Sequence, residues 1–400
     1  MLSRSASWKL AIIITALIAT GTVTELFFFH PIATPTPDKS SSSSYFDYLV
    51  VIVLENKNLD QVYGASCSGN CSYITQLADT YGLAENYSGV AHLSMPNYMT
   101  LTSGGNYSYS PYTHNCYGFL NETCQVTSKN VVDAIENTGR TWKVYITNYG
   151  SSGCKVMQVP PFVYYTDIYQ NTTRCSKIVD ASPFGHSQRW DVIPTTLLSD
   201  LNNVALTPNF MWLGPSACDT GYCVRNSTNV IENRCGQNST TFAACVSQAN
   251  EYLSLVVPRI LDSAIFRTKS ALLFITWDEG AGIQGFGNIC PNLGQTYPTC
   301  NDMIPAILVG THVKPGFKSN TSFSHYSFVK TLGVAWNTSL LDGNSPLLDN
   351  AAPMTAFFDI PSPADDGGQM QPLVSWILAE QDRDSVRPGE QVGQLSLQLS

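Results

Sequence analysis

The amino-acid sequence predicts an α/β fold with a mostly parallel central sheet and helices on both faces. The first observation is a set of short, continuously apolar runs bounded by polar turns, as is typical of strands buried on both faces. These runs occupy residues 48–54, 142–146, 210–213, 271–277 and 304–309. The second observation is that segments with helical spacing lie between the runs, and this alternation indicates a doubly wound sheet.

Three segments carry the apolar spacing of helices: residues 130–137, 252–266 and 325–336. Gly139 provides a C-terminal stop for the first. Pro258 must kink the second or begin a new helix, because proline lacks a backbone N–H. Segments rich in cysteine and glycine lie between the predicted elements, and we interpret them as loop insertions.

Composition excludes one class of partner. Among 400 residues, charged side chains make up only 13% and the formal net charge is -9. Nucleic acids are bound through clustered Lys and Arg, and no basic stripe is present. We therefore expect no nucleic-acid partner.

The chain is predicted to comprise four parts. Residues 1–32 form a signal peptide or an N-terminal membrane anchor, residues 33–44 a linker rich in Pro and Ser, residues 45–360 the folded domain, and residues 361–400 an extension with a partly disordered tail.

The N-terminal segment has two interpretations. A cleaved signal needs small residues after its apolar core, while a retained transmembrane helix needs about 20 apolar residues, which residues 9–29 supply. Either interpretation predicts an extracellular or cell-surface protein, and the oligomeric state stays open.

Twelve cysteines and nine Asn-x-Ser/Thr sequons agree with export. An even cysteine count favours disulfides, and the irregular spacing disfavours a zinc site. Sequential pairing would staple separate loops, although the sequence does not establish the connectivity. The expected pairs are Cys67–Cys71, Cys116–Cys124, Cys154–Cys175, Cys218–Cys223, Cys235–Cys245 and Cys290–Cys300.

Acidic side chains follow two of the predicted strands. Residues 48–54 run into Glu55 and Asn56, and residues 271–277 run into Asp278 and Glu279. Ligands bind at the carboxyl edge of open α/β sheets, and carboxylates clustered there repel unless a cation neutralises them. We therefore expect a divalent metal site of unknown metal identity and number. The alternative is that these residues cap helices or face solvent, and Glu279 alone could orient a neighbouring ligand instead of binding metal.

A hydroxyl and an amide lie between the two acidic pairs. Ser94 opens a segment that can begin a helix, and coordination to a cation would lower the pKa of its hydroxyl and prepare it for attack. Asn97 could donate to a phosphoryl oxygen. His325 could contact the phosphoryl group or protonate the leaving group. His92 is either a substrate contact or a structural histidine.

Six segments resemble, in amino-acid sequence and in their order along the chain, the phosphoesterase family of acid phosphatases and bacterial phospholipases C within the alkaline phosphatase superfamily. They are VVIVLENKNLDQVYG, SMPNYMTLTSG, PPFVYYTDI, LLFITWDEG, MIPAILVGTHVKPG and FSHYSFVKTLGVAW. The resemblance implies an alkaline phosphatase-like fold and a small phosphorylated substrate that is hydrolysed through a phosphoseryl intermediate on Ser94. It implies metal ligands at Glu55, Asn56, Ser94, Asp278 and Glu279, and His325 matches a histidine of the family.

The chain also departs from the family pattern. Val159-Pro160-Pro161 stands where relatives often have His-Asn-Pro, and PSACDTGY, with Asp219 its only acid, stands where they often have an Asn, Asp and His cluster. These departures favour an acid phosphatase-type phosphomonoesterase. The alternatives are a phospholipase C-like phosphodiesterase acting on phospholipid, and a non-catalytic surface glycoprotein that keeps the fold.

Overall fold

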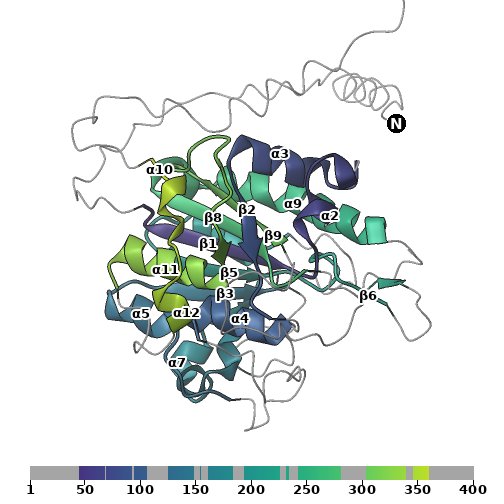
Figure 1. Cartoon of the computed structure of the whole chain (residues 1–400). Coiled ribbons are helices and arrows are strands. Elements are labelled where there is room, and N and C mark those ends of the chain that lie inside the picture. Colours follow the sequence, from purple (N-terminus) through teal and green to yellow (C-terminus); the bar gives the residue numbers. More distant parts are fainter. Residues whose placement is uncertain are drawn as a thin grey trace, which may run out of the picture. The chain divides into compact units, whose positions relative to one another are not determined.

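A nine-stranded sheet runs through the part of the chain that the structure describes (Figure 1). The structure is a computed structural model and describes residues 45–67, 69–91, 94–105, 125–147, 154, 161–182, 193–225, 231–233, 242–280, 303–338 and 346–359. The strand order is β10-β2-β9-β8-β1-β5-β3-β4, and β11 also pairs with β2. The strands are β1 (Tyr48–Leu54), β2 (Gly82–Ser88), β3 (Trp142–Ile146), β4 (Ile178–Asp180), β5 (Phe210–Gly214), β8 (Ala271–Trp277), β9 (Met303–Gly310), β10 (Lys318–Ser319) and β11 (Phe323–Ser324).

The sheet is mostly parallel, as predicted. Strand β1 lies parallel to both β5 and β8, and β3 lies parallel to β4 and β5. Strand β9 is antiparallel to both of its neighbours, β8 and β2. Because two reversals restore the direction, β1, β8 and β2 all end at the same edge of the sheet.

Helices cover both faces of the sheet. Figure 1 shows α3, α9 and α10 on one face and α4, α5 and α11 on the other. The helices are α2 (Leu59–Val62), α3 (Ser72–Thr80), α4 (Ser94–Ser103), α5 (Val131–Asn137), α6 (Thr166–Tyr169), α7 (Thr172–Cys175), α8 (Thr195–Leu201), α9 (Phe242–Leu261), α10 (Ala264–Thr268), α11 (His325–Trp336) and α12 (Pro346–Asp349). All seven residues of β8 are buried, because helices pack on both sides of the strand.

Two of the three predicted helices are confirmed. Helix α5 begins after Asn130, whose Oδ1 accepts a hydrogen bond from the Val132 N–H at 3.0 Å, and Gly139 follows the helix with φ 75°. Helix α11 has the predicted bounds. The third prediction is wrong in its bounds: α9 begins earlier than expected, accommodates Pro258 in its last turn and ends before the separate helix α10.

Strand β2 was not predicted, because its sequence GLAENYS has no continuous apolar run. Its pairing with β9 shifts register between Ala84 and Tyr87. The intervening Glu85 and Asn86 are only half-buried there, so polar side chains are tolerated inside the strand.

Sequential disulfide pairing is only partly correct. Cys67–Cys71 and Cys154–Cys175 are confirmed. Cys223 pairs with Cys245, which overturns the expected pairs Cys218–Cys223 and Cys235–Cys245. Cys223 begins β6 (Cys223–Arg225), which pairs with β7 (Ile231–Asn233). The reason for the pairing is that the segment before Cys223 packs on the first turn of α9, where a Cβ added to Gly221 would lie 2.6 Å from the Cys245 carbonyl.

Other predictions fall partly or wholly outside the described residues. They concern the N-terminal segment at 1–32, the linker at 33–44, the tail at 361–400, the pairs Cys116–Cys124 and Cys290–Cys300, and His92. No helix of the described residues is long and apolar enough to cross a membrane.

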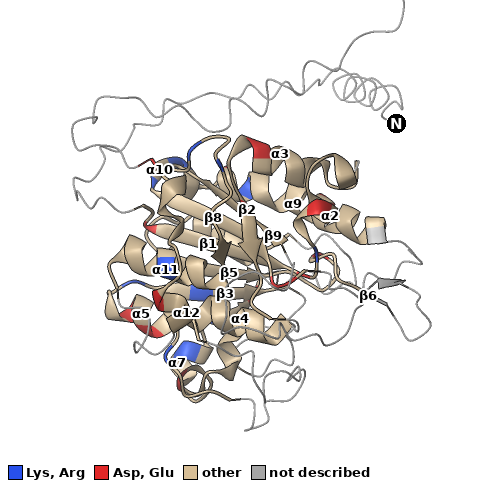
Figure 2. Ribbon diagram, viewed as in Figure 1, with Lys and Arg blue, Asp and Glu red and all other residues tan. Residues whose placement is uncertain are grey.

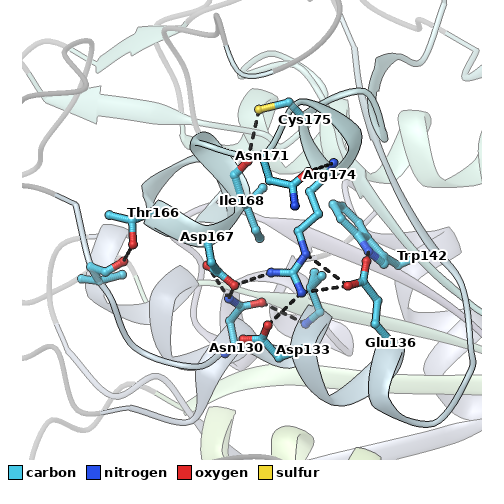
Figure 3. Close-up of polar contacts among 12 residues, drawn as sticks. Asn130, Asp133, Glu136, Trp142, Thr166, Asp167, Ile168, Asn171, Arg174 and Cys175 are labelled. Carbon is cyan, nitrogen blue, oxygen red and sulfur yellow. Dashed lines mark hydrogen bonds and ion pairs between the residues drawn. The ribbon is translucent and has the colours of Figure 1, made fainter.

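A network of charges joins α5, α6 and α7 (Figure 3). Arg174 of α7 donates to Asp133 Oδ1 at 2.9 Å and to Glu136 Oε2 at 2.7 Å, and it also pairs with Asp167. Lys177 Nζ lies 3.2 Å from Glu136 Oε1. Because one guanidinium bridges three carboxylates from two other helices, this network fixes the three short helices to one another. It matters most for α7, which has no buried residue.

We expect Arg174→Gln to lower the free energy of unfolding by roughly 2 to 3 kcal/mol, between the values typical of exposed and fully buried ion pairs. The substitution leaves three neighbouring carboxylates without their shared counter-ion. Urea unfolding measures the change. The control is Arg267→Gln, which breaks the exposed pair with Asp262 and should cost less than about 1 kcal/mol. Equal losses in the two variants would contradict a stabilising role for the network.

Candidate active site

The parallel pairing of β1 with β8 brings the two predicted acidic pairs together. Leu54 lies opposite Trp277 in the register, so the residues that follow them are neighbours. The Asp278 N–H donates to the Leu54 carbonyl at 3.0 Å, and the Asn56 N–H donates to Asp278 Oδ1 at 3.2 Å.

Asn56 has an unusual backbone conformation and a fixed side chain. Its φ is 55°, in the left-handed region, which asparagine tolerates better than most residues. Its Nδ2 donates to Glu279 Oε1 at 2.9 Å. Because an ionised carboxylate only accepts hydrogen bonds, this contact determines which end of the amide faces Glu279. The carbonyl oxygen of the amide must therefore point elsewhere.

Two buried oxygens at this edge have no hydrogen-bond donor among the described residues. They are Asn56 Oδ1 and Asp278 Oδ2. Leaving a buried acceptor without a partner costs about 1 to 3 kcal/mol, so each such atom calls for an explanation. A hard cation would satisfy both oxygens at once.

The remaining donors suit a divalent cation. Within the described part of the chain, no three His, Cys, Asp or Glu side chains are grouped so as to hold a metal by themselves. A cation at this edge would therefore depend on the Asn56 amide and the Ser94 hydroxyl in addition to carboxylates. Burial raises the pKa of Asp278 well above its ordinary value, and the charges of Glu279 and Glu55 raise it further. A bound cation would favour the ionised form instead.

Ser94 is the first residue of α4 and is buried. Its Oγ lies 3.4 Å from Glu279 Oε1, to which it donates, and it also hydrogen-bonds the Asp278 carboxylate. The structure thus brings together Glu55, Asn56, Ser94, Asp278 and Glu279, which the sequence places on three separate segments.

The chain that precedes Ser94 passes very close to β8. A Cβ atom added to Gly89 would lie 3.1 Å from the Asp278 carbonyl and 3.2 Å from Asn97 Oδ1. Only glycine allows this approach without a shift of the backbone.

Asn97 holds this turn together. Its Oδ1 accepts hydrogen bonds from the N–H groups of Val90 and Ala91 at 2.7 and 3.2 Å, and its Nδ2 donates to the Ala91 carbonyl at 2.7 Å. We expected Asn97 to contact a phosphoryl oxygen. Its described contacts are instead to the backbone, because the turn buries N–H and C=O groups that require partners.

His325 lies next to Asp278 and is fully buried. Its Nε2 is 2.6 Å from the Asp278 carbonyl and its Nδ1 is 3.0 Å from the Tyr87 hydroxyl. Burial lowers the pKa of His325 to about 4, although the Asp278 carbonyl opposes the shift. With both ring nitrogens engaged and the ring neutral, His325 supports Asp278. The expected contact with the phosphoryl group or leaving group stays a prediction.

Sequence reasoning missed two residues that contact Glu55. Tyr98 donates from its hydroxyl to Glu55 Oε1 at 3.0 Å, and the fully buried Lys57 donates from Nζ to the Glu55 carbonyl at 3.2 Å. Burial lowers the pKa of Lys57 to about 8, and the charges of Asp278 and Glu55 oppose this shift. Both residues stand beside predicted site residues in the sequence, and that proximity was the only signal available.

A model of the Phosphoesterase family matches residues 68–339. The matched range includes Ser94, Asp278, Glu279 and His325, and begins after Glu55 and Asn56. No curated protein matches this chain.

Solved structures with a similar fold include a protein in the alkaline phosphatase superfamily from Vibrio parahaemolyticus. It is 14% identical, with a TM-score of 0.50, over 77% of this chain and 71% of that chain. Phosphonate monoester hydrolase from Silicibacter pomeroyi is 11% identical (TM-score 0.47, 80% and 78% covered). The lipoteichoic acid synthase LtaP from Listeria monocytogenes is 10% identical (TM-score 0.49, 80% and 79% covered). At these identities a likeness shows the fold alone, and we rely only on the Vibrio structure for it.

We expect Asn97→Asp to lower the free energy of unfolding by about 1 to 3 kcal/mol, because an acceptor would replace the donor that faces the Ala91 carbonyl. Urea unfolding tests this. The control is Asn250→Asp, since Asn250 Oδ1 only accepts from the Tyr73 and Ile74 N–H groups and an aspartate keeps that ability. Unchanged stability of Asn97→Asp together with a raised KM would instead favour the phosphoryl contact.

Proposed function

Because the chain belongs to the phosphoesterase family of the alkaline phosphatase superfamily, and is therefore a hydrolase acting on phosphoric ester bonds, we propose that it is an extracytoplasmic, metal-dependent phosphomonoesterase of the acid phosphatase type. Ser94 is its nucleophile. The observation that carries the proposal is the hydrogen bond from Ser94 Oγ to Glu279 Oε1, beside two buried oxygens that have no described donor.

In the first half-reaction, Glu279 Oε1 takes the proton of Ser94 as Oγ attacks phosphorus. The Asn56 amide keeps Glu279 in place for this transfer through its hydrogen bond at 2.9 Å. The bond between Oγ and phosphorus forms as the ester bond breaks, the departing alkoxide takes a proton from water, and the hydroxide that remains takes the proton from Glu279. Water then hydrolyses the phosphoserine, which releases phosphate and restores the Ser94 hydroxyl.

A divalent cation held by Glu55, Asn56, Asp278 and Ser94 would lower the pKa of the hydroxyl and offset negative charge on the phosphoryl oxygens. In this assignment Glu279 does not bind the cation. It accepts the proton of Ser94, and its hydrogen bond with Asn56 orients that ligand, in agreement with the alternative that it orients a neighbouring ligand. In phosphoryl transfer, most of the rate acceleration comes from positioning and charge neutralisation, which suits a site made of buried and partly buried polar contacts.

Export is supported by the cysteines. Three disulfides join cysteines within the described residues, and such bonds persist in oxidising compartments. The substrate is proposed to be a small phosphomonoester, because the sequence lacks the histidines that the phospholipase C branch often carries. A non-catalytic glycoprotein is disfavoured, since family membership indicates an enzyme.

Ser94→Ala should lower the rate of hydrolysis of a chromogenic phosphomonoester by a factor of at least about a thousand, because no other hydroxyl replaces the nucleophile. Phosphomonoester, phosphodiester and phospholipid substrates are assayed in parallel with wild type and variant. Ser176→Ala is a suitable control, because Ser176 lies on α7's C-terminal side, where its Oγ donates only to the local Thr173 carbonyl in the described contacts. Full activity of Ser94→Ala would refute the nucleophile, and a preference for phospholipid would favour the phospholipase alternative.

Removal of divalent metal by a chelator should abolish activity, and adding back a single type of cation should restore it. Metal analysis of the active protein and reactivation with Mg²⁺, Mn²⁺, Ca²⁺ and Zn²⁺ separately identify the ion. Active protein that contains no bound cation would refute metal dependence.

A further inference from the structure

Tyr98 is a buried side chain that links the helix of the nucleophile to Glu55. It lies one turn beyond Ser94 on α4, so the two side chains project from the same face of the helix. Its hydroxyl donates to Glu55 Oε1 at 3.0 Å. This hydrogen bond connects two segments of the site that are distant in the sequence.

The backbone of Glu55 is held by a separate set of contacts. Its N–H donates to the Thr220 carbonyl at 3.4 Å, and its carbonyl accepts from Lys57 Nζ. The same Nζ donates to the Gly221 carbonyl at 2.8 Å, so Lys57 joins the end of β1 to the segment that follows β5. These contacts fix the main chain but not the rotatable bonds of the Glu55 side chain. The hydrogen bond from Tyr98 acts on the carboxylate itself.

The ring of Tyr98 makes this hydroxyl a rigid donor. It is only 4% exposed and packs edge-on against Trp212 of β5, with ring centroids 6.3 Å apart. Trp212 in turn packs against Phe162 at 5.5 Å. A buried tyrosine has only two side-chain torsions, and packing on the ring fixes both of them.

We propose that Tyr98 is a positioning residue whose hydroxyl orients the Glu55 carboxylate towards the cation beside Ser94 and so strengthens the binding of divalent metal. This inference rests on the metal-dependent function proposed above. A carboxylate offers about four lone-pair positions, so the hydrogen bond to Oε1 leaves others for the cation. Residues that orient a ligand in this way typically change metal affinity by about 10- to 100-fold.

Tyr98→Phe tests the proposal, because it removes one oxygen atom and keeps the ring. Full-length protein freed of metal is titrated calorimetrically with Mg²⁺, Mn²⁺, Ca²⁺ and Zn²⁺ separately. We expect the Kd of the ion that binds wild type to rise about 10-fold or more. The metal concentration for half-maximal activity should rise in parallel, with the KM for substrate at saturating metal unchanged.

The matched control is Tyr165→Phe. The Tyr165 hydroxyl lies 2.9 Å from Thr102 Oγ1 and donates to the Met99 carbonyl at 3.2 Å, and both partners are on α4. The control therefore loses buried hydrogen bonds on the same helix without a described contact to Glu55. We expect it to lower the thermal stability of the metal-free protein and to leave metal affinity unchanged.

Equal metal affinity in wild type and Tyr98→Phe would overturn the role of Tyr98 while leaving the proposed function intact. An equal loss of affinity in both variants would also overturn it, because packing of α4 would then explain the effect. Failure of wild type to bind any of the four ions would refute the metal site itself, which the chelation experiment tests independently.

Discussion

The parallel, in-register pairing of β1 with β8 is the constraint on which the rest of the site depends. Their backbone hydrogen bonds and fully buried side chains fix the two strand ends side by side, with Leu54 opposite Trp277. Glu55 and Asp278 must then leave the sheet as neighbours. Two carboxylates in a buried place repel each other and lose hydration, so the surrounding structure must offset a large electrostatic cost.

The neighbouring side chains offset that cost in different ways. Lys57 places a buried ammonium group near Asp278 and Glu55. The N–H and amide of Asn56 donate to Asp278 and Glu279, which requires the left-handed conformation of its backbone. The Tyr98 hydroxyl donates a hydrogen bond to the Glu55 carboxylate. Even so, two oxygens remain without a described donor, as expected for a site that is completed by a cation.

The site is also joined to a third strand end. Strand β2 ends at the same edge because β9 reverses direction between it and β8. Gly89 allows the chain to pass the Asp278 carbonyl, and Asn97 then holds the turn that leads to Ser94. The His325 ring contacts the Asp278 carbonyl through Nε2. These contacts thus fix the position of Ser94, and small shifts in the residues that hold it should lower activity if it is the nucleophile proposed above.

The sequence by itself determined the fold class, five strands, two helices and the five residues that meet at the site. It could do so because buried strands leave continuous apolar runs, and because the residues after parallel strands must share one edge. It did not reveal β2, the antiparallel direction of β9 or the Cys223–Cys245 pair, since each depends on contacts between distant segments. Only the tertiary structure decided which polar groups face one another. It placed Asn97 against the backbone before Ser94 and His325 against Asp278, and it brought Tyr98 and Lys57 to Glu55. Hydrogen-bond partners depend on distance in space and not on position in the chain.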